Sequence, residues 1–416
     1  MSTTPTAHRQ GICIAAALLV LGVTPTAAAG EAEQARGDPG VALSWNAIAW
    51  RTIGVEGQKP PPVAQLYLGL VSTAVYDAVR TAEAADGPAA SDVAAATAAH
   101  DALAHFFPAS QTALDADYDA WLAGVPDDEA RQNGRQAGAD AAAALIADRA
   151  DDGREAPITL PRPADPPPGM WVPTGTGEMT APWLGFTEPL LIDSPEQFAT
   201  DGPDPLDSEE YAADVAEVAA MGSATSTART AEQTDLALFW SDNPIRQYQD
   251  AMRERAVRHG MDIVGTVRML AAANTAGADA LITCWRGKYD VPLWRPITAI
   301  QQADRDGNPA TTPDPAWSSL RPAPPYPEWP SGHACVSSAV AETLEELFGA
   351  GQVDMEIRSS VTGTTRIYDD EQAWLDDVVN ARVWLGIHFR DAVDDARETG
   401  RAVADAVACE FGSSDS

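Results

Sequence analysis

Three short clusters of residues stand out because their side chains suit anion chemistry. They are Lys288 to Pro296, Pro330 to His333, and Arg382 to His388. Together they supply three cations, a hydroxyl, a glycine amide and two imidazoles. Such groups can hold a tetrahedral oxyanion and transfer a proton or an electron pair at its apex.

Each cluster lies where the sequence predicts the end of a helix. Gly287 is expected to end one helical run, and Pro296 is well placed to begin the next. Ser331 precedes an apolar helical pattern, so its hydroxyl and the following amides would lie at a helix N-terminus, which attracts anions. Gly386 is expected to interrupt a helix, and His388 to begin another. These helix ends could therefore meet around one pocket.

Each cluster also has a simpler explanation when it is taken alone. A Ser-Gly-His tripeptide is most often a helix cap followed by a surface histidine, and a Lys/Arg pair is usually a solvated face. A lone His388 is usually a buried core residue, and Trp285 and Tyr326 could be core aromatics. Ser331 lacks the G-x-S-x-G elbow of a serine hydrolase. The occurrence of all three clusters in order favours the oxyanion pocket.

In order and spacing, the clusters resemble the signature of the vanadium-dependent haloperoxidase and type 2 phosphatidic acid phosphatase superfamily. That signature reads K-x6-R-P, then P-S-G-H, then R-x5-H. Trp285, the early segment around the proline run 60–62, and residues 306–313 are similar to the haloperoxidase branch. The chain departs from the phosphatase pattern at Ala381, where that pattern has serine, and at Ala392, where it has aspartate. The group that orients the His388 ring is therefore open, although a carboxylate, Asp391, is adjacent.

The resemblance implies a role for each member of the clusters. The expected oxyanion-binding residues, for vanadate or phosphate, are Lys288, Arg295, Ser331, Gly332 and Arg382. His388 is expected to be the vanadium ligand of a haloperoxidase, or the nucleophile that forms a phosphohistidine in a phosphatase. His333 is expected to be the acid–base group on the opposite side. Trp285 and Tyr326 are candidates for the halide side.

The resemblance implies a vanadium-dependent haloperoxidase, and the N-terminal segment described below implies that it is secreted. Such an enzyme oxidises halide with hydrogen peroxide at a His-bound vanadate and halogenates an organic acceptor. The alternative is a secreted acid phosphatase of the same superfamily, which acts on a phosphate ester and needs no cofactor. A third hypothesis, from another class, is a helical protein that binds an anion without catalysis.

The chain is strongly acidic, with 61 Asp and Glu against 27 Lys and Arg and a net charge of −34. This charge argues against nucleic acid and anionic membranes as partners. Lys59 and Lys288 are the only lysines, so a lysine inside a phosphate-type cluster is more suggestive than usual. Cys284 and Cys335 lie beside the clusters, and the sequence allows either a bridge or two small buried thiols.

The N-terminus has the pattern of a secretory signal peptide over residues 1–29. Arg9 precedes an apolar run from Ile12 to Val23, and three alanines end at Ala29. Secretion is therefore expected. No later stretch reaches the roughly 18 apolar residues of a membrane span, so no membrane embedding is expected.

The remaining chain has helical periodicity nearly throughout. Residues 30–40 are predicted to be a disordered lead, and residues 41–412 one all-α domain of packed helical bundles. The C-terminal part, about 227–411, is expected to be the phosphatidic acid phosphatase-like core. No β-type alternation of useful length is present. Helical surfaces of this size often form homodimers, and the sequence leaves the oligomeric state open.

Overall fold

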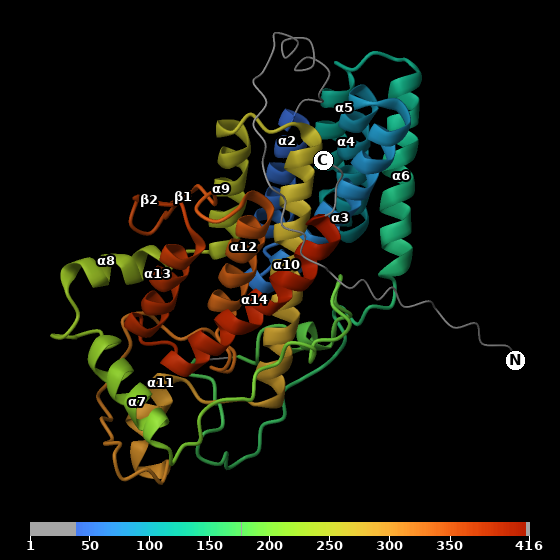
Figure 1. Cartoon of the computed structure of the whole chain (residues 1–416). Coiled ribbons are helices and arrows are strands. Elements are labelled where there is room, and N and C mark those ends of the chain that lie inside the picture. Colours follow the sequence, from blue (N-terminus) through green and yellow to red (C-terminus); the bar gives the residue numbers. More distant parts are fainter. Residues whose placement is uncertain (1–38, 176, 413–416) are drawn as a thin grey trace, which may run out of the picture.

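The structure, a computed structural model, describes residues 39–175 and 177–412, and helices dominate it (Figure 1). The all-α prediction is confirmed. The expected signal peptide and residues 30–38 of the expected lead lie outside the described residues. The first described helix begins at Pro39, inside the segment that was predicted to be disordered.

The first group of helices comes from the N-terminal third of the chain. Its elements are α2 (Pro39–Trp50), a π-helical turn (Arg51–Glu56), α3 (Pro61–Asp86), α4 (Pro88–Phe106), a 3-10 turn (Pro108–Ser110), α5 (Gln111–Leu122) and α6 (Glu129–Asp148). α4 packs against α3 and α6. The α4–α6 contact is close because Gly138 has no side chain: a Cβ there would lie 2.7 Å from the carbonyl oxygen of Ala94. The two helices therefore pack closely at this contact because the residues there are small.

The second group of helices contains all three clusters. Its elements are α7 (Glu209–Met221), α8 (Ala231–Phe239), α9 (Pro244–Arg258), α10 (Ile263–Asp290), α11 (Pro296–Gln301), a 3-10 turn (Ala303–Arg305), α12 (Gly332–Phe348), α13 (Glu371–Trp384) and α14 (Arg390–Gly412). The long helix α10 runs through the middle of the molecule and packs on α3, α12 and α14 (Figure 1). It therefore joins the two groups around one hydrophobic core.

The long segment between α6 and α7 runs over the surface and contains a single 3-10 turn (Pro182–Phe186) within its described residues. A buried carboxylate on α10 holds it in place. Asp279 accepts hydrogen bonds from the backbone amides of Leu190 at 2.6 Å, Leu191 at 2.8 Å and Ile192 at 3.1 Å. Asp279 can therefore be buried in an apolar helix, because its carboxylate accepts hydrogen bonds from these three backbone amides.

The structure also contains a short β-hairpin, which the sequence pattern did not predict. β1 (Met355–Arg358) pairs antiparallel with β2 (Thr365–Tyr368), with Met355 opposite Tyr368 and Arg358 opposite Thr365. Each strand has only four residues, which is too short for alternation to stand out from the surrounding pattern. The hairpin packs on α9.

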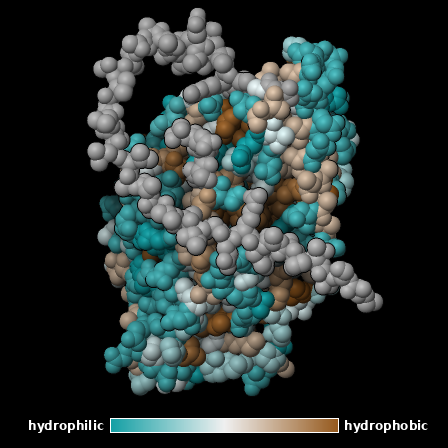
Figure 2. Space-filling model, turned by 45° about the vertical axis from the view of Figure 1, so that its right-hand side comes forward, coloured by the Kyte–Doolittle hydropathy of each residue, from teal (hydrophilic) through white to brown (hydrophobic). Residues whose placement is uncertain are grey.

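Two of the helix starts that were expected at the clusters are confirmed. Pro296 begins α11, and Ser331 is the N-cap of α12. The expected end at Gly287 is wrong, because α10 continues to Asp290. A Cβ at Gly287 would lie 3.0 Å from the ring of Pro330, so this glycine permits a close loop approach. No described helix is long and apolar enough to cross a membrane. The face shown in Figure 2 is mostly hydrophilic, with small hydrophobic patches.

Candidate active site

The three clusters converge on one buried cage. Arg295 links the first and third clusters: its Nη1 donates to the carbonyl oxygen of Ile387 at 2.8 Å and lies 3.1 Å from Nε2 of His388. The side chains of the cage are at most 9% exposed, and its members are Lys288, Arg295, Ser331, His333, Arg382 and His388. The charges that act on His388 are those of Arg295, Lys288, Arg382 and His333, so these residues lie close together, and their roles around an oxyanion stay a prediction.

Several polar atoms of the cage are buried without a hydrogen-bond partner among the described residues. They are Nη2 of Arg295, Nε of Arg382 and Nε2 of His333. Buried polar groups are nearly always satisfied, so unpaired guanidinium donors indicate a missing acceptor. A tetrahedral oxyanion such as vanadate or phosphate supplies acceptors of the required kind. The residues present therefore fit such a group.

Lys288 differs from the expectation in one respect. Its Nζ donates to the backbone carbonyl oxygens of Pro327, Glu328 and Pro330, which accounts for all three of its N–H donors. Its charge still acts on the cage, but its hydrogen bonds hold the loop that precedes Ser331. Burial in this surrounding lowers the pKa of Lys288 to about 8.

The N-terminus of α12 supplies the neutral donors. Ser331 is the N-cap, and its hydroxyl oxygen accepts from the amide of Ala334 at 3.4 Å. Gly332 begins the helix, so its amide has no intrahelical acceptor. A Cβ at Gly332 would lie 2.8 Å from the ring of Trp285. Glycine is therefore required here because Trp285 packs directly beneath the helix start.

Glu328, which no sequence motif indicated, is the carboxyl group that orients His388. Oε1 of Glu328 lies 2.8 Å from Nδ1 of His388 and accepts from the amide of Phe389 at 2.9 Å. Glu328 is fully buried. Asp391, the carboxylate next to the expected position, instead contacts the amide of Asp204. The available signal was an acid three residues before Ser331, together with the missing aspartate at Ala392.

These contacts determine the tautomer of His388. Arginine only donates, so Nε2 of His388 accepts from Arg295 and carries no proton. The proton of the neutral ring is then on Nδ1, where Glu328 accepts it. This assignment holds whether Glu328 is ionised or carries a proton on Oε2, because Oε1 is an acceptor in both states. Nε2 is thus the unprotonated ring nitrogen that a metal ligand or a nucleophile requires, and Arg295 has to release its lone pair before it can act.

Burial and the neighbouring cations shift the pKa values of the cage. Desolvation, followed by the charges of Arg295, Lys288 and Arg382, holds the pKa of His388 well below its ordinary value. Desolvation and Arg382 lower the pKa of His333 in the same way. Desolvation raises the pKa of Glu328 to about 8, opposed by Arg295. Both imidazoles are therefore neutral at physiological pH before an anion binds.

Trp285 and Tyr326 lie beside the cage as a packed aromatic pair. Their ring centroids are 5.0 Å apart, and Lys288 Nζ lies 5.1 Å from the Tyr326 centroid. Nε1 of Trp285 donates to the carbonyl oxygen of Thr180 at 3.0 Å. The two aromatics support the cations and line a pocket, and their assignment to halide stays a prediction. Cys284 and Cys335 are both buried and free, so no bridge joins them.

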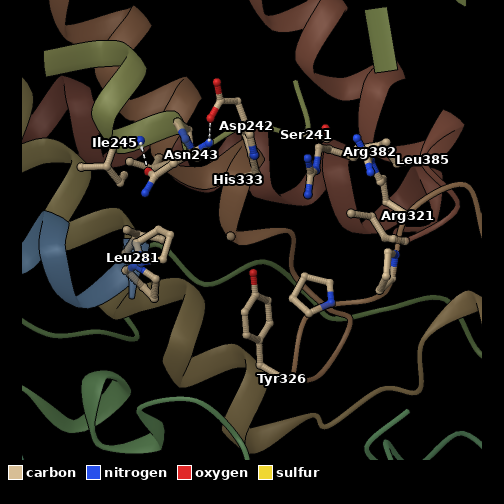
Figure 3. A pocket seen from close by; sticks show the side chains of 18 of the residues that line it. Ser241, Asp242, Asn243, Ile245, Leu281, Arg321, Tyr326, His333, Arg382 and Leu385 are labelled. Carbon is tan, nitrogen blue, oxygen red and sulfur yellow. Dashed lines mark hydrogen bonds between the residues drawn. The ribbon is translucent and has the colours of Figure 1, made fainter. Parts of the chain in front are cut away.

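A pocket of about 550 Å³ opens onto this cage (Figure 3). Gly332, His333 and Arg382 line it, together with Trp285 and Tyr326. Lys288, Arg295, Ser331 and His388 do not, so they form the closed side of the cage. Access from solvent is therefore on the side of His333.

An all-α fold with this cage defines a class: the fold is that of the helical vanadium haloperoxidases. Residues 268–412 match the family model described as the VCPO second helical-bundle domain. The resemblance to the haloperoxidase branch is thereby confirmed.

Particular relatives agree with this class. Vanadium chloroperoxidase of Curvularia inaequalis is 27% identical in an alignment 320 positions long, which covers 60% of this chain and 51% of that protein. The chain thus aligns with about half the length of this curated relative. The crystal structure of a bacterial vanadium-dependent iodoperoxidase superposes with a TM-score of 0.73 at 22% identity, covering 89% of this chain and 95% of that one. The apo form of a bacterial vanadium-dependent chloroperoxidase superposes with a TM-score of 0.68 at 20% identity, covering 91% and 98%.

Proposed function

We propose that the protein is a vanadium-dependent haloperoxidase that oxidises halide with hydrogen peroxide. One observation carries the proposal: the unpaired N–H donors of Arg295 and Arg382 share a buried cage with the unprotonated Nε2 of His388. His388 would bind the metal of a vanadate whose oxygens are held by the two guanidiniums and the Gly332 amide. Relatives that carry vanadium in their names support this choice of oxyanion.

Each part of the cage then has a separate task. Bound vanadate supplies a Lewis acid that activates peroxide toward halide. Arg295, Arg382 and the charge of Lys288 stabilise the negative charge in a site from which water is largely excluded. His333 takes the peroxide proton at Nε2, because that atom is buried without a partner among the described residues. Glu328 keeps the proton of His388 on Nδ1.

The test is reconstitution of purified, phosphate-free protein with vanadate, followed by bromide oxidation with hydrogen peroxide. Activity should require vanadate and fall by at least about a hundredfold in His388→Ala, which removes the metal-binding nitrogen. The matched control is His105→Ala, an exposed histidine on α4. Absence of peroxide-dependent oxidation of chloride, bromide and iodide by the vanadate-loaded protein would contradict the proposal.

The alternative function, a phosphatase, would use the same cage. One assay distinguishes it from the haloperoxidase function. Metal-free protein would hydrolyse p-nitrophenyl phosphate, and added vanadate would inhibit it. The comparisons do not favour this alternative, since the relatives named above are haloperoxidases. If variants of His333 and His388 leave both activities unchanged, the protein is only an anion binder.

We also propose that the chain is exported through its N-terminal segment. The apolar run from Ile12 to Val23 and the alanines up to Ala29 support this. Expression of the full chain in a secreting bacterium should yield extracellular protein whose N-terminus, by mass spectrometry, follows Ala29. Uncleaved protein in the cell fraction would contradict export.

A further inference from the structure

The pocket above the cage is large enough for an organic molecule. Its volume of about 550 Å³ falls in the range of sites that enclose small ligands. One end reaches His333 and Arg382, and the pocket extends from there between the N-termini of α3 and α9 and the loop before Tyr326. A molecule lying in it would place one end at the reacting centre. Figure 3 shows Tyr326 and His333 on opposite sides of this space.

Most of the residues that line the pocket are apolar. Its apolar residues are Pro61, Pro62, Pro244, Ile245, Leu281, Pro322, Pro324, Val336, Val361, Leu385 and Ile387. Proline has no backbone N–H and a fixed φ, so these segments neither donate hydrogen bonds nor adapt easily. The body of a molecule bound here is therefore apolar, and a flat ring suits the side formed by Trp285 and Tyr326.

The side-chain acceptors of Asp242 and Asn243 in the polar part of the wall are already occupied. The carboxylate of Asp242 accepts from Arg246 at 2.6 Å and from both the amide and the hydroxyl of Ser360. Oδ1 of Asn243 accepts from the first amides of α9, beginning with Ile245 at 3.0 Å. Figure 3 shows these side chains turned toward the helix start. A ligand consequently meets few free acceptors in this wall.

The donors, in contrast, are available. Arg321 is exposed at the pocket edge, and within the described chain its guanidinium has no hydrogen bond or ion pair. The side-chain amide of Asn243 likewise donates to no described residue. Figure 3 places Arg321 on the same side of the pocket as Arg382. In a chain of net charge −34, an unpaired arginine at this place makes the pocket attract anions.

We propose that this pocket binds an organic acceptor with an apolar ring and an anionic group, and that Arg321 binds the anionic group. The inference rests on the haloperoxidase function proposed above. Halogenation then occurs at the ring while the acceptor is bound. A ring C–H bond breaks as the carbon–halogen bond forms, and the proton leaves to water. Hydrogen peroxide accepts the two electrons that the halide loses and is reduced to water.

The first arm of the test measures binding without vanadate. The probes are 3-(4-hydroxyphenyl)propanoate and its methyl ester, which have the same ring and differ in charge. Calorimetry measures the affinity of the protein for each probe. The acid should bind wild-type protein about tenfold more tightly than the ester, because one charge-assisted contact contributes roughly that factor. Arg321→Leu should abolish the preference, and Arg321→Lys should retain part of it. The control is Arg358→Leu, whose side chain is 62% exposed outside the pocket.

The second arm is a competition between the two probes during turnover with vanadate, peroxide and bromide. Free hypobromous acid would halogenate both rings equally, because two methylene groups insulate the ring from the charge. Wild-type enzyme should brominate the acid several-fold faster than the ester. Arg321→Leu should bring the ratio to about one, and this ratio does not depend on the total rate of bromide oxidation, because both probes compete in one reaction.

The outcomes separate this inference from the proposed function. Equal binding of acid and ester by wild-type protein, or an unchanged preference in Arg321→Leu, overturns the pocket assignment. A product ratio near one with active wild-type enzyme also overturns it, although the haloperoxidase function would stand. If no halide is oxidised, the function fails, and the binding arm still decides the ligand class.

Discussion

At the residue scale, the proposed catalysis depends on one ring nitrogen of His388 being unprotonated. His388 contacts Glu328 through Nδ1 and Arg295 through Nε2, and both partners are fully buried. A carboxyl group that accepts the Nδ1 proton of a metal-binding imidazole fixes the tautomer and the orientation of the ring. In this chain the carboxylate comes from the loop before Ser331, whereas the phosphatase pattern places it four residues after the histidine. Glu328 is therefore a positioning residue that acts through His388.

Replacing Glu328 with alanine should weaken vanadate binding by about 10- to 100-fold, the usual effect of removing such a partner. Equilibrium binding of vanadate measures the loss. Nitrogen NMR of the vanadate-free protein should show His388 protonated on Nδ1 in the wild type and as a tautomer mixture in the variant. Glu342→Gln is the control, because Glu342 is also largely buried but bonds to Arg401. Unchanged affinity and an unchanged tautomer would contradict the assignment.

Helix ends and the turns between them place the reactive groups at the element scale. α13 carries Arg382 and ends at Trp384, and the chain then reverses through Gly386, whose φ is +77°, to reach His388. A Cβ at Gly386 would overlap the carbonyl oxygen of Gly222, which follows α7. This turn thus needs glycine for its backbone conformation and for a close contact with a distant element.

Gly386→Ala should therefore lower the free energy of unfolding by more than the backbone strain of a positive φ alone would. A positive φ costs alanine about 1 kcal/mol, and the overlap adds a further cost on the order of 2 kcal/mol. Gly307→Ala provides the control, because Gly307 has a φ of +79°, close to that of Gly386, but nothing within 4 Å of an added Cβ. Urea unfolding should show the larger loss for Gly386→Ala, which should also lose vanadate affinity. Equal losses for the two variants would mean that the Gly222 contact is unimportant.

At the scale of the whole molecule, the excess of acidic residues brings several carboxylates close together at the start of α14. Asp391 lies there close to Asp204, Asp214 and Asp395. Desolvation and then the neighbouring carboxylates raise the pKa of Asp391 to about 7, and desolvation raises that of Asp214 to about 6. The folded protein holds these protons more tightly than the unfolded chain, in which an aspartate releases its proton near about pH 4. Ionisation of the group therefore opposes folding.

The sign of the pH dependence follows from this difference. Between about pH 4 and pH 7 the folded state binds more protons, so these groups lower the stability as pH rises. Asp391→Asn should raise the melting temperature at pH 8 and have little effect at pH 4. Partial exposure of Asp391 limits the gain to the order of 1 kcal/mol. Asp127→Asn, an exposed control, should show no such trend. An Asp391→Asn effect that is the same at both pH values would contradict the linkage.

Local features were predictable from the sequence because neighbouring residues produce them. The spacing within each cluster, the proline that begins α11 and the Ser331 cap of α12 depend on a few adjacent positions. Helical periodicity over long stretches was sufficient for the all-α class. The histidines and cations of the cage could be named from these clusters because the resemblance assigned their order.

Contacts between distant segments were decided only by tertiary packing. Glu328 reaches His388, and the donors of Lys288 are used by the loop carbonyls, because that loop packs against α10 and α14. The pocket wall likewise combines Pro61 with Arg321, which no local pattern relates. The sequence alone thus determined which chemistry-bearing residues exist and which helices carry them. The packing of those helices decided which donors stay unpaired and face a ligand, since hydrogen-bond partners depend on distance in space.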